Sequence, residues 1–289
     1  MGNCISCIGS VIQIIEKYHV IFEKLTLNIT PQEFSQVHNQ GNSDDIMGEM
    51  SKTCVNLASQ TENGILSNFA IDNVLFICCM NYTKPSYSLG AGPCNDAINI
   101  ANFMQKRGLS VYYLHNSSST VYLQWLKFFL KNTRKYLMTY YTGHGTQVTD
   151  TSGDEADGLD EAYVFEDRFL IDDDLEKALD ACKKNNSVKV VLLSDCCHSG
   201  SIWDLKEGKT VPNVLALSAS KDTQTAKQTQ LDAKEQGVFT FCLLKAIEQE
   251  PNCSPNRLRE IIQPTLDRFE QGYTSSASTS SLLTSQIMP

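Results

Sequence analysis

Short apolar runs recur along the central part of the chain and predict buried strands. Five such runs, rich in Val, Ile, Leu and Tyr, lie at 74–80, 110–114, 136–142, 188–194 and 214–218. Continuous apolar runs of this length are typical of strands buried on both faces of a parallel sheet. Patterns that predict helices lie between and after these runs, at 94–106, 121–131, 172–182 and 238–247. This alternation predicts an α/β fold, a mostly parallel β-sheet with helices on both faces.

The two ends of the chain lack this alternation. Residues 11–25 carry apolar side chains at the spacing of an amphipathic helix, whereas residues 30–70 are polar with weak periodicity. We therefore expect an N-terminal extension at 1–70 and a globular domain at 71–272. From Gly272 onward the chain is rich in Ser and Thr, so residues 273–289 are expected to form a frayed tail.

The composition narrows the class of protein. The chain has 289 residues, of which 42% are hydrophobic and 20% charged, and these values exclude low-complexity disorder as the dominant state. No stretch approaches the roughly 18 apolar residues of a transmembrane helix, and the start lacks the basic and apolar regions of a secretory signal. We therefore expect a cytoplasmic protein.

The cysteines point to reduced thiols. There are 11 of them, and some sit as adjacent pairs within apolar runs, at 78–79 and 196–197, rather than at the spacings of a disulfide framework. Zinc is weakly supported, because the adjacent residues Cys196, Cys197 and His198 cannot all converge on one ion.

The negative charge is concentrated in one segment. The net charge is −9, but residues 150–174 hold eleven acidic side chains and one basic one, so this segment carries −10 and the rest of the chain +1. Such a cluster repels itself unless a cation or a basic ligand binds it. Clustered Lys and Arg, which a nucleic-acid surface requires, are not found, so we expect no nucleic-acid partner.

Two predicted strands end in residues that suit nucleophilic catalysis. His144 lies between Gly143 and Gly145 after the third apolar run, and Cys197 follows the fourth run within Asp195–Gly200. Glycines allow close approach of the backbone, and we expect them to leave the imidazole exposed. Because functional groups gather where parallel strands end, a thiol nucleophile and an imidazole base are predicted at this edge.

Three segments together resemble the metacaspases, which are caspase-like cysteine peptidases of clan CD. They are Tyr-Thr-Gly-His-Gly-Thr-Gln at 141–147, Gly-Asp-Glu-Ala-Asp-Gly-Leu-Asp-Glu at 153–161 and Asp-Cys-Cys-His-Ser-Gly at 195–200. The resemblance covers roughly residues 72 to 250. It implies a caspase-like fold, with a large-subunit part to about residue 205 and a small-subunit part from about 212. The arrangement resembles type I members without a Pro- and Gln-rich prodomain.

The resemblance also implies roles for individual residues. His144 corresponds to the general base and Cys197 to the nucleophile, while Cys196 is interpreted as structural. The backbone N–H groups of Gly145 and Cys197 correspond to the oxyanion hole.

Metacaspases cleave proteins and peptides after Arg or Lys, which requires carboxylates in the primary specificity pocket. Asp195 and Asp96 match the two pocket aspartates of the family, and Thr142 is expected to line the same pocket. A guanidinium is well held by paired carboxylates, so this assignment fits the chemistry.

Many metacaspases are activated by Ca²⁺, which acts as a regulator rather than a catalyst. By resemblance the ligands are Asp160, Asp172, Asp173 and Asp204. The spacing does not fit the EF-hand pattern, and a solvated acidic loop is the alternative. Family members are often zymogens that cut themselves, and the candidate positions here are Lys206, Lys209, Lys221, Lys227 and Lys234.

The first residues fit a lipidation pattern. Gly2 follows Met1 with Ser6 at the position of the myristoylation signal, and Cys4 and Cys7 could carry palmitoyl groups. Two acyl chains would anchor the chain stably to a membrane. Dual acylation and a plain cytosolic terminus are both open at this point.

Other functions compete with the peptidase. A catalytically silent caspase-like scaffold or adaptor is the non-enzyme alternative, although both His144 and Cys197 are retained. A tyrosine phosphatase is excluded, because residues 199–204 contain no Arg to hold phosphate after the Cys. The resemblance implies a monomer rather than an obligate dimer, and no residue pattern decides this point.

Overall fold

A computed structural model describes Leu27 and residues 42–150, 153, 158–181, 187–197, 199–203, 205, 213–220 and 236–289. The helix expected at 11–25, the acylation candidates Gly2, Cys4 and Cys7, the predicted ligand Asp204 and the candidate processing lysines lie outside the described residues. The described helices are α3 (Ser43–Thr53), α4 (Glu62–Asn68), α5 (Gly92–Gln105), α6 (Ser119–Asn132), α7 (Asp172–Asp180), α8 (Gln236–Gln249) and α9 (Pro255–Asp267), with short 3-10 helices at Leu57–Ser59 and Ser280–Leu283.

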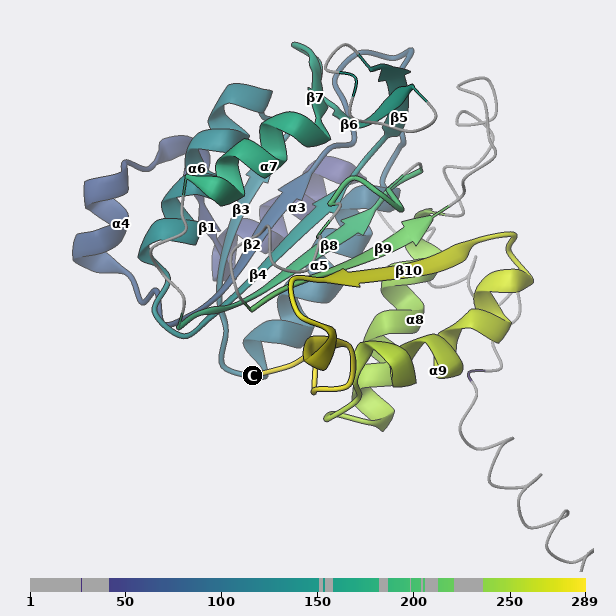
Figure 1. Ribbon diagram of the computed structural model, residues 1–289. Helices are drawn as coiled ribbons and strands as arrows, with labels where there is room; N and C mark the ends of the chain where they lie inside the picture. Colours follow the sequence, from purple (N-terminus) through teal and green to yellow (C-terminus); the bar gives the residue numbers. More distant parts are fainter. Residues whose placement is uncertain are drawn as a thin grey trace, which may run out of the picture.

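The described strands form two sheets (Figure 1). The strands are β1 (Val55–Asn56), β2 (Asn73–Cys79), β3 (Ser110–His115), β4 (Tyr136–Thr142), β5 (Gly145–Thr149), β6 (Leu159–Val164), β7 (Phe169–Ile171), β8 (Lys189–Asp195), β9 (Val214–Ser220) and β10 (Gly272–Ala277). The larger sheet has the order β1-β3-β2-β4-β8-β9-β10, and all its neighbours are parallel except β9 and β10. The five predicted strands are β2, β3, β4, β8 and β9, so the predicted mostly parallel α/β fold is confirmed.

Helices cover both faces of the larger sheet, as the apolar runs predicted. Buried side chains of α3, α5, α8 and α9 form one core with the sheet, and those of α4, α6 and α7 form a second core on the opposite face. Side chains alternate along each strand, so odd-numbered residues of β2 and β8 and even-numbered residues of β4 belong to the first core. This parity determines which strand-end residues share a face.

A small antiparallel sheet, β5-β6-β7, follows directly on β4. β5 and β6 flank the acidic stretch that begins at Asp150, and β7 leads into α7, whose first turn holds Asp172, Asp173 and Asp174. The sequence predicted none of these three strands, because they are short and polar residues interrupt their apolar pattern.

Both ends of the described chain are more ordered than expected. Within the expected extension, Met50 of α3 and Ile65 of α4 are fully buried in the two cores. The expectation of a frayed C-terminal tail is wrong. β10 pairs with β9 along its whole length, and Ile287 is buried, with its carbonyl accepting a hydrogen bond from the Tyr136 hydroxyl. Small Ser and Thr side chains suit an edge strand as well as a loop, so composition alone misled the prediction.

Among the described helices, none combines the length and apolar character needed to cross a membrane.

Candidate active site

The candidate site lies where the chain order of the larger sheet reverses direction. From β2 the chain passes to β3 on one side, whereas from β4 it continues to β8 on the other. A crevice at the carboxyl ends of the strands is the usual ligand site of such sheets. The register places Thr142, the last residue of β4, opposite Asp195, the last residue of β8. His144 and Cys197 each follow two residues later, so the structure brings these two predicted residues to neighbouring strand ends.

His144 is held by two tyrosines of the loop between β2 and α5. Its backbone N–H donates to the Tyr82 hydroxyl at 2.7 Å, and the Tyr82 ring stacks on the imidazole with centroids 4.9 Å apart. Its Nε2 lies 2.8 Å from the carbonyl oxygen of Tyr87. A carbonyl oxygen only accepts, so this hydrogen bond requires the proton on Nε2 and leaves the lone pair on Nδ1.

The imidazole is more enclosed than the sequence led us to expect. His144 is only 8% exposed, and burial lowers its pKa, although the hydrogen bond to Tyr87 opposes this. The expectation of an exposed ring between glycines is therefore wrong, because Tyr82 and Tyr87 cover it. A buried imidazole with a lowered pKa is neutral near pH 7 and can accept a proton.

The two glycines that flank His144 allow close contact with the residues that follow β8 and β2. A Cβ atom at Gly145 would overlap the carbonyl oxygen of Cys197, and one at Gly143 would lie 2.8 Å from the Cβ of Met80. The predicted close approach of the backbone is thus present at both positions. Cys197 is 9% exposed. Cys196 is buried in the second core, the one formed with α4, α6 and α7, and burial raises the pKa of its thiol well above the ordinary value.

The two predicted pocket carboxylates are both buried. Asp195 is fully buried, and Asp96 in the first turns of α5 is 1% exposed. Oδ2 of Asp195 accepts hydrogen bonds from the Thr240 hydroxyl at 2.6 Å and the Thr240 N–H at 3.3 Å. Burial raises the pKa of Asp195 well above the ordinary value, and the nearby Asp96 carboxyl raises it further.

One of the two carboxyls, that of Asp96, borders open space. A cavity of about 340 Å³ lies between α5 and α8, with Asp96 and Thr240 among its lining residues. Oδ1 of Asp195 has no hydrogen-bond partner among the described residues, and Asp195 makes no ion pair with a described basic side chain. Thr142 is buried beside Asp195 in the strand register. A ligand cation would relieve the electrostatic cost of this arrangement.

The described members of the predicted Ca²⁺ set lie around β6 and α7. Asp160 is 3% exposed in β6, Asp172 begins α7, and Asp173 makes an ion pair with Lys177 at 3.0 Å. Their carboxylates do not form a converging group of ligand atoms in the part of the chain that the structure describes. The geometry of these three residues alone therefore does not make a Ca²⁺ site.

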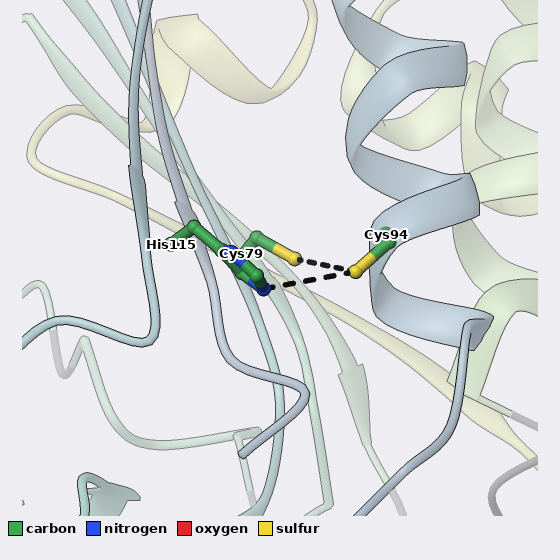
Figure 2. A group of neighbouring side chains, drawn as sticks. All are labelled: Cys79, Cys94 and His115. Carbon is green, nitrogen blue, oxygen red and sulfur yellow. Dashed lines mark hydrogen bonds between the residues drawn. The ribbon is translucent and has the colours of Figure 1, made fainter. Parts of the chain in front are cut away.

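A second group of Cys and His side chains lies at the same edge of the sheet, and the sequence did not predict it (Figure 2). Cys94 Sγ is 3.8 Å from Cys79 Sγ and 3.9 Å from His115 Nε2, which is also a separation compatible with a catalytic dyad. The pKa of Cys94 is lowered to about 6, chiefly by the hydrogen bond from Cys79 and, less strongly, by His115. The three residues come from two strands and a helix, so no local spacing in the sequence reveals them.

The fold is a mostly parallel α/β sheet with helices on both faces, and comparison with known proteins identifies the family. Residues 72–287 match the caspase domain, so the chain belongs to the caspase-domain family of peptidases.

Curated relatives are named metacaspases. Metacaspase-1 of Arabidopsis thaliana is 29% identical over 141 residues, covering 39% of this chain and 38% of that protein. Metacaspase-6 of Arabidopsis thaliana is 33% identical over 139 residues, covering 46% and 37%. The chain therefore spans less than half the length of these two relatives.

A solved structure supports the fold. The crystal structure of protein GSU0716 from Geobacter sulfurreducens aligns with a TM-score of 0.50 and 20% identity, covering 75% of this chain and 98% of that one.

Proposed function

We propose that the chain is a cysteine endopeptidase that cleaves proteins and peptides after Arg or Lys, with Cys197 as nucleophile and His144 as general base. The observation that carries this proposal is the strand register. It pairs Thr142 with Asp195, so that His144 and Cys197 follow neighbouring strand ends while a buried carboxyl lies on the same edge.

The hydrogen bonds of His144 support a base in a defined orientation. The Tyr87 carbonyl accepts the Nε2 proton, so Nδ1 is the atom that takes the proton of the Cys197 thiol. The thiolate then attacks the scissile carbonyl carbon, and the peptide nitrogen leaves with the proton that His144 returns. Water hydrolyses the resulting thioester, with His144 again as base, and restores the thiol. The backbone N–H groups of Gly145 and Cys197 are proposed to bind the oxyanion.

The carboxyl pair supports the Arg or Lys preference. Asp195 is buried without an ion-pair partner among the described residues, and Asp96 lies close enough to raise its pKa. A substrate guanidinium would bring the compensating charge and would favour the ionised carboxylate. An Asp substrate would instead bring a negative charge to this pair of carboxyls and would be rejected.

Ca²⁺ is proposed as an activator and not as a catalyst. The proposal rests on the resemblance and on the acidic segment from Asp150 to Asp174, and no chemical step requires the ion. Asp160, Asp172 and Asp173 would need a rearrangement, or the addition of Asp204, to converge on it. A cytoplasmic location, membrane association through acylated Gly2, Cys4 and Cys7, a monomeric state and self-cleavage are proposed on the sequence alone.

Two alternatives remain testable. Cys94 and His115 form a second Cys–His pair, with 3.9 Å between Sγ and Nε2, and could supply the dyad instead. A catalytically silent scaffold would have neither pair active.

The deciding experiment compares fluorogenic peptides that end in Arg or in Asp, each with millimolar Ca²⁺ or with chelator, beside a Cys197→Ala chain. Cleavage after Arg that requires Cys197 supports the nucleophile and the pocket. Cleavage after Asp contradicts the pocket assignment, and cleavage after Arg in chelator contradicts only the role of Ca²⁺. Absence of turnover from folded, reduced protein favours an uncleaved zymogen or the scaffold, and prior cleavage with trypsin separates these two.

A further inference from the structure

Three ligand atoms of types that bind transition metals converge on one point (Figure 2). The Sγ atoms of Cys79 and Cys94 and a ring nitrogen of His115 all lie within 4.8 Å of one another. In Figure 2, Cys94 points from α5 toward the sheet, and Cys79 and His115 point from the strand ends toward Cys94. Convergence of side chains from three separate elements is the arrangement that a metal site requires.

The distances fit a tetrahedral ion better than a disulfide. With Zn–S near 2.3 Å and Zn–N near 2.0 Å, two thiolates on a tetrahedral ion lie about 3.8 Å apart, and a thiolate and an imidazole nitrogen about 3.6 Å apart. The observed separations are 3.8 Å between the two Sγ atoms and 3.9 Å from Cys94 Sγ to His115 Nε2. A disulfide would bring the two sulfurs to about 2.05 Å.

The fold holds two of the ligands rigidly. Cys79 and His115 are the last residues of β2 and β3, and they are direct neighbours in the parallel register. Cys94 lies in the first turn of α5, which begins at Gly92 and has Pro93 as its second residue. Ligands on strands and a helix are positioned more accurately than ligands on loops, so little ordering is needed on binding.

An ion could reach the three ligand atoms from the side of His115, because the two cysteines are buried. Cys79 and Cys94 are completely buried, whereas His115 is partly exposed. His115 Nε2 also lies 2.7 Å from Oδ1 of Asn81, and Asn116 Nδ2 donates to the same oxygen at 2.8 Å. The Asn81 oxygen is therefore fixed next to the three ligand atoms. There it can occupy the fourth coordination position of the ion or orient a bound water.

We propose that Cys79, Cys94 and His115 form a binding site for one thiophilic divalent ion of the Zn²⁺ class. On binding, the two thiols lose their protons to solvent, and His115 binds through Nε2 with its remaining proton on Nδ1. The hydrogen bond between His115 and Asn81 is then replaced by the bond to the metal.

The ion would join the end of β2 to the start of α5. The segment between them carries Tyr82 and Tyr87, which contact His144, and Asp96 follows Cys94 by two residues. Occupancy would therefore restrain the loop that orients His144. Metal binding itself does not depend on the proposed peptidase activity, so the two proposals can fail separately.

The test uses the 289-residue chain with Cys197→Ala, which removes self-cleavage and a competing thiol. Reduced, metal-free protein is titrated with Zn²⁺ against a chromogenic chelator, and with Co²⁺ to follow the thiolate-to-metal charge-transfer absorption. One ion per chain is expected, with a charge-transfer band. Cys79→Ala and Cys94→Ala should each weaken Zn²⁺ binding by more than about 100-fold, beyond the effect of losing an outer-shell partner.

Cys78→Ala is the matched control. Cys78 is equally buried and adjacent in sequence, but it belongs to the core on the opposite face of the sheet, so its loss should leave Zn²⁺ affinity unchanged. X-ray absorption of the Zn²⁺-loaded chain with Cys79, Cys94 and His115 intact provides a measurement that needs no further substitution. It should show two sulfurs at about 2.3 Å and nitrogen at about 2.0 Å.

Three results would overturn the proposal. The first is that no ion binds at equal concentrations of protein and Zn²⁺. The second is a bound ion without sulfur neighbours, and the third is binding that survives both Cys79→Ala and Cys94→Ala. A Cys79–Cys94 disulfide in protein that binds no ion after reduction would also overturn it, in favour of a redox pair.

Discussion

Two Cys–His groups lie along one edge of the same sheet, and their surroundings differ. At the ends of β4 and β8, His144 is stacked on Tyr82 and anchored by the Tyr87 carbonyl, while Cys197 lies on the neighbouring turn against Gly145. At the ends of β2 and β3, His115 faces two buried thiols. The first group has one imidazole with a fixed orientation. The second group has two thiol sulfurs and an imidazole nitrogen around one point.

The difference indicates that neighbouring groups, rather than the residue types alone, set the chemistry for which a Cys and a His are suited. A carbonyl acceptor on Nε2 selects the tautomer that a base requires. A second thiol beside the first supplies another ligand instead of an oriented base. Asp195 stands in the same register row as Thr142, Cys79 and His115, so both groups lie at the strand ends that also carry the buried carboxyl.

The largest expected effect distinguishes the two groups as catalysts. Cys197→Ala should reduce kcat/KM for an Arg peptide by at least about a thousandfold, because the nucleophile is lost. Cys94→Ala should leave kcat/KM within about tenfold, or about 1.4 kcal/mol in the barrier. Both variants are measured by peptide hydrolysis in chelator-treated buffer with Ca²⁺ restored. The opposite ranking would transfer the dyad to Cys94 and His115.

The next effect concerns the pocket carboxyl. Asp195→Asn should lower kcat/KM for an Arg peptide by about 100-fold, since a buried partner of the guanidinium loses its charge. The same change should preserve or increase the free energy of unfolding near neutral pH. Burial raises the pKa of Asp195 in the folded chain, so ionisation opposes folding there.

The sign of this pH effect is testable. The unfolded Asp ionises at about pH 3.9, and the folded carboxyl only at higher pH, so the stability that the neutral carboxyl allows is lost as pH rises above that value. Urea unfolding of both chains at several pH values should show the native chain losing stability relative to Asp195→Asn as pH increases. A constant difference would mean that Asp195 is already ionised and compensated in the folded protein.

The sequence predicted the central fold and the main strand-end residues because their signals are local. Apolar runs marked β2, β3, β4, β8 and β9, and the glycines around His144 marked a close backbone contact. Enclosure of His144 was missed, because Tyr82 and Tyr87 come from a loop about 60 residues earlier in the chain.

The second group was missed for a related reason. Cys79, Cys94 and His115 become neighbours only through the parallel register of β2 with β3 and the return of the chain through α5. β10 was missed because its edge position leaves it without an apolar pattern. Long-range pairing carries information that residue spacing does not contain.

A smaller effect tests whether Tyr82 positions His144. Tyr82→Phe removes the hydroxyl that accepts from the His144 N–H and donates to the Val164 carbonyl. We expect kcat to fall about tenfold with KM little changed, and the free energy of unfolding to fall by about 1–3 kcal/mol. Activity assays and urea unfolding measure the two quantities.

Tyr112→Phe is the matched control for that change. Its side chain is also buried, and its hydroxyl donates to the Ala70 carbonyl at 2.6 Å rather than contacting His144. It should lose similar stability with kcat unchanged. Equal loss of kcat in both variants would assign the effect of Tyr82 to general destabilisation.

The smallest effect is the pH dependence that His144 itself contributes to stability. Burial lowers its pKa in the folded chain, so the unfolded chain binds the proton first as pH falls below about 6.5. Stability that is complete above that pH is therefore lost as pH decreases toward the folded pKa. A His144→Gln chain lacks this proton, and its unfolding free energy, measured between pH 7 and pH 5, should fall less than that of the native chain. Parallel pH curves would show that the imidazole is not buried in solution, and the contrast with the ligand-like His115 would then lose its physical basis.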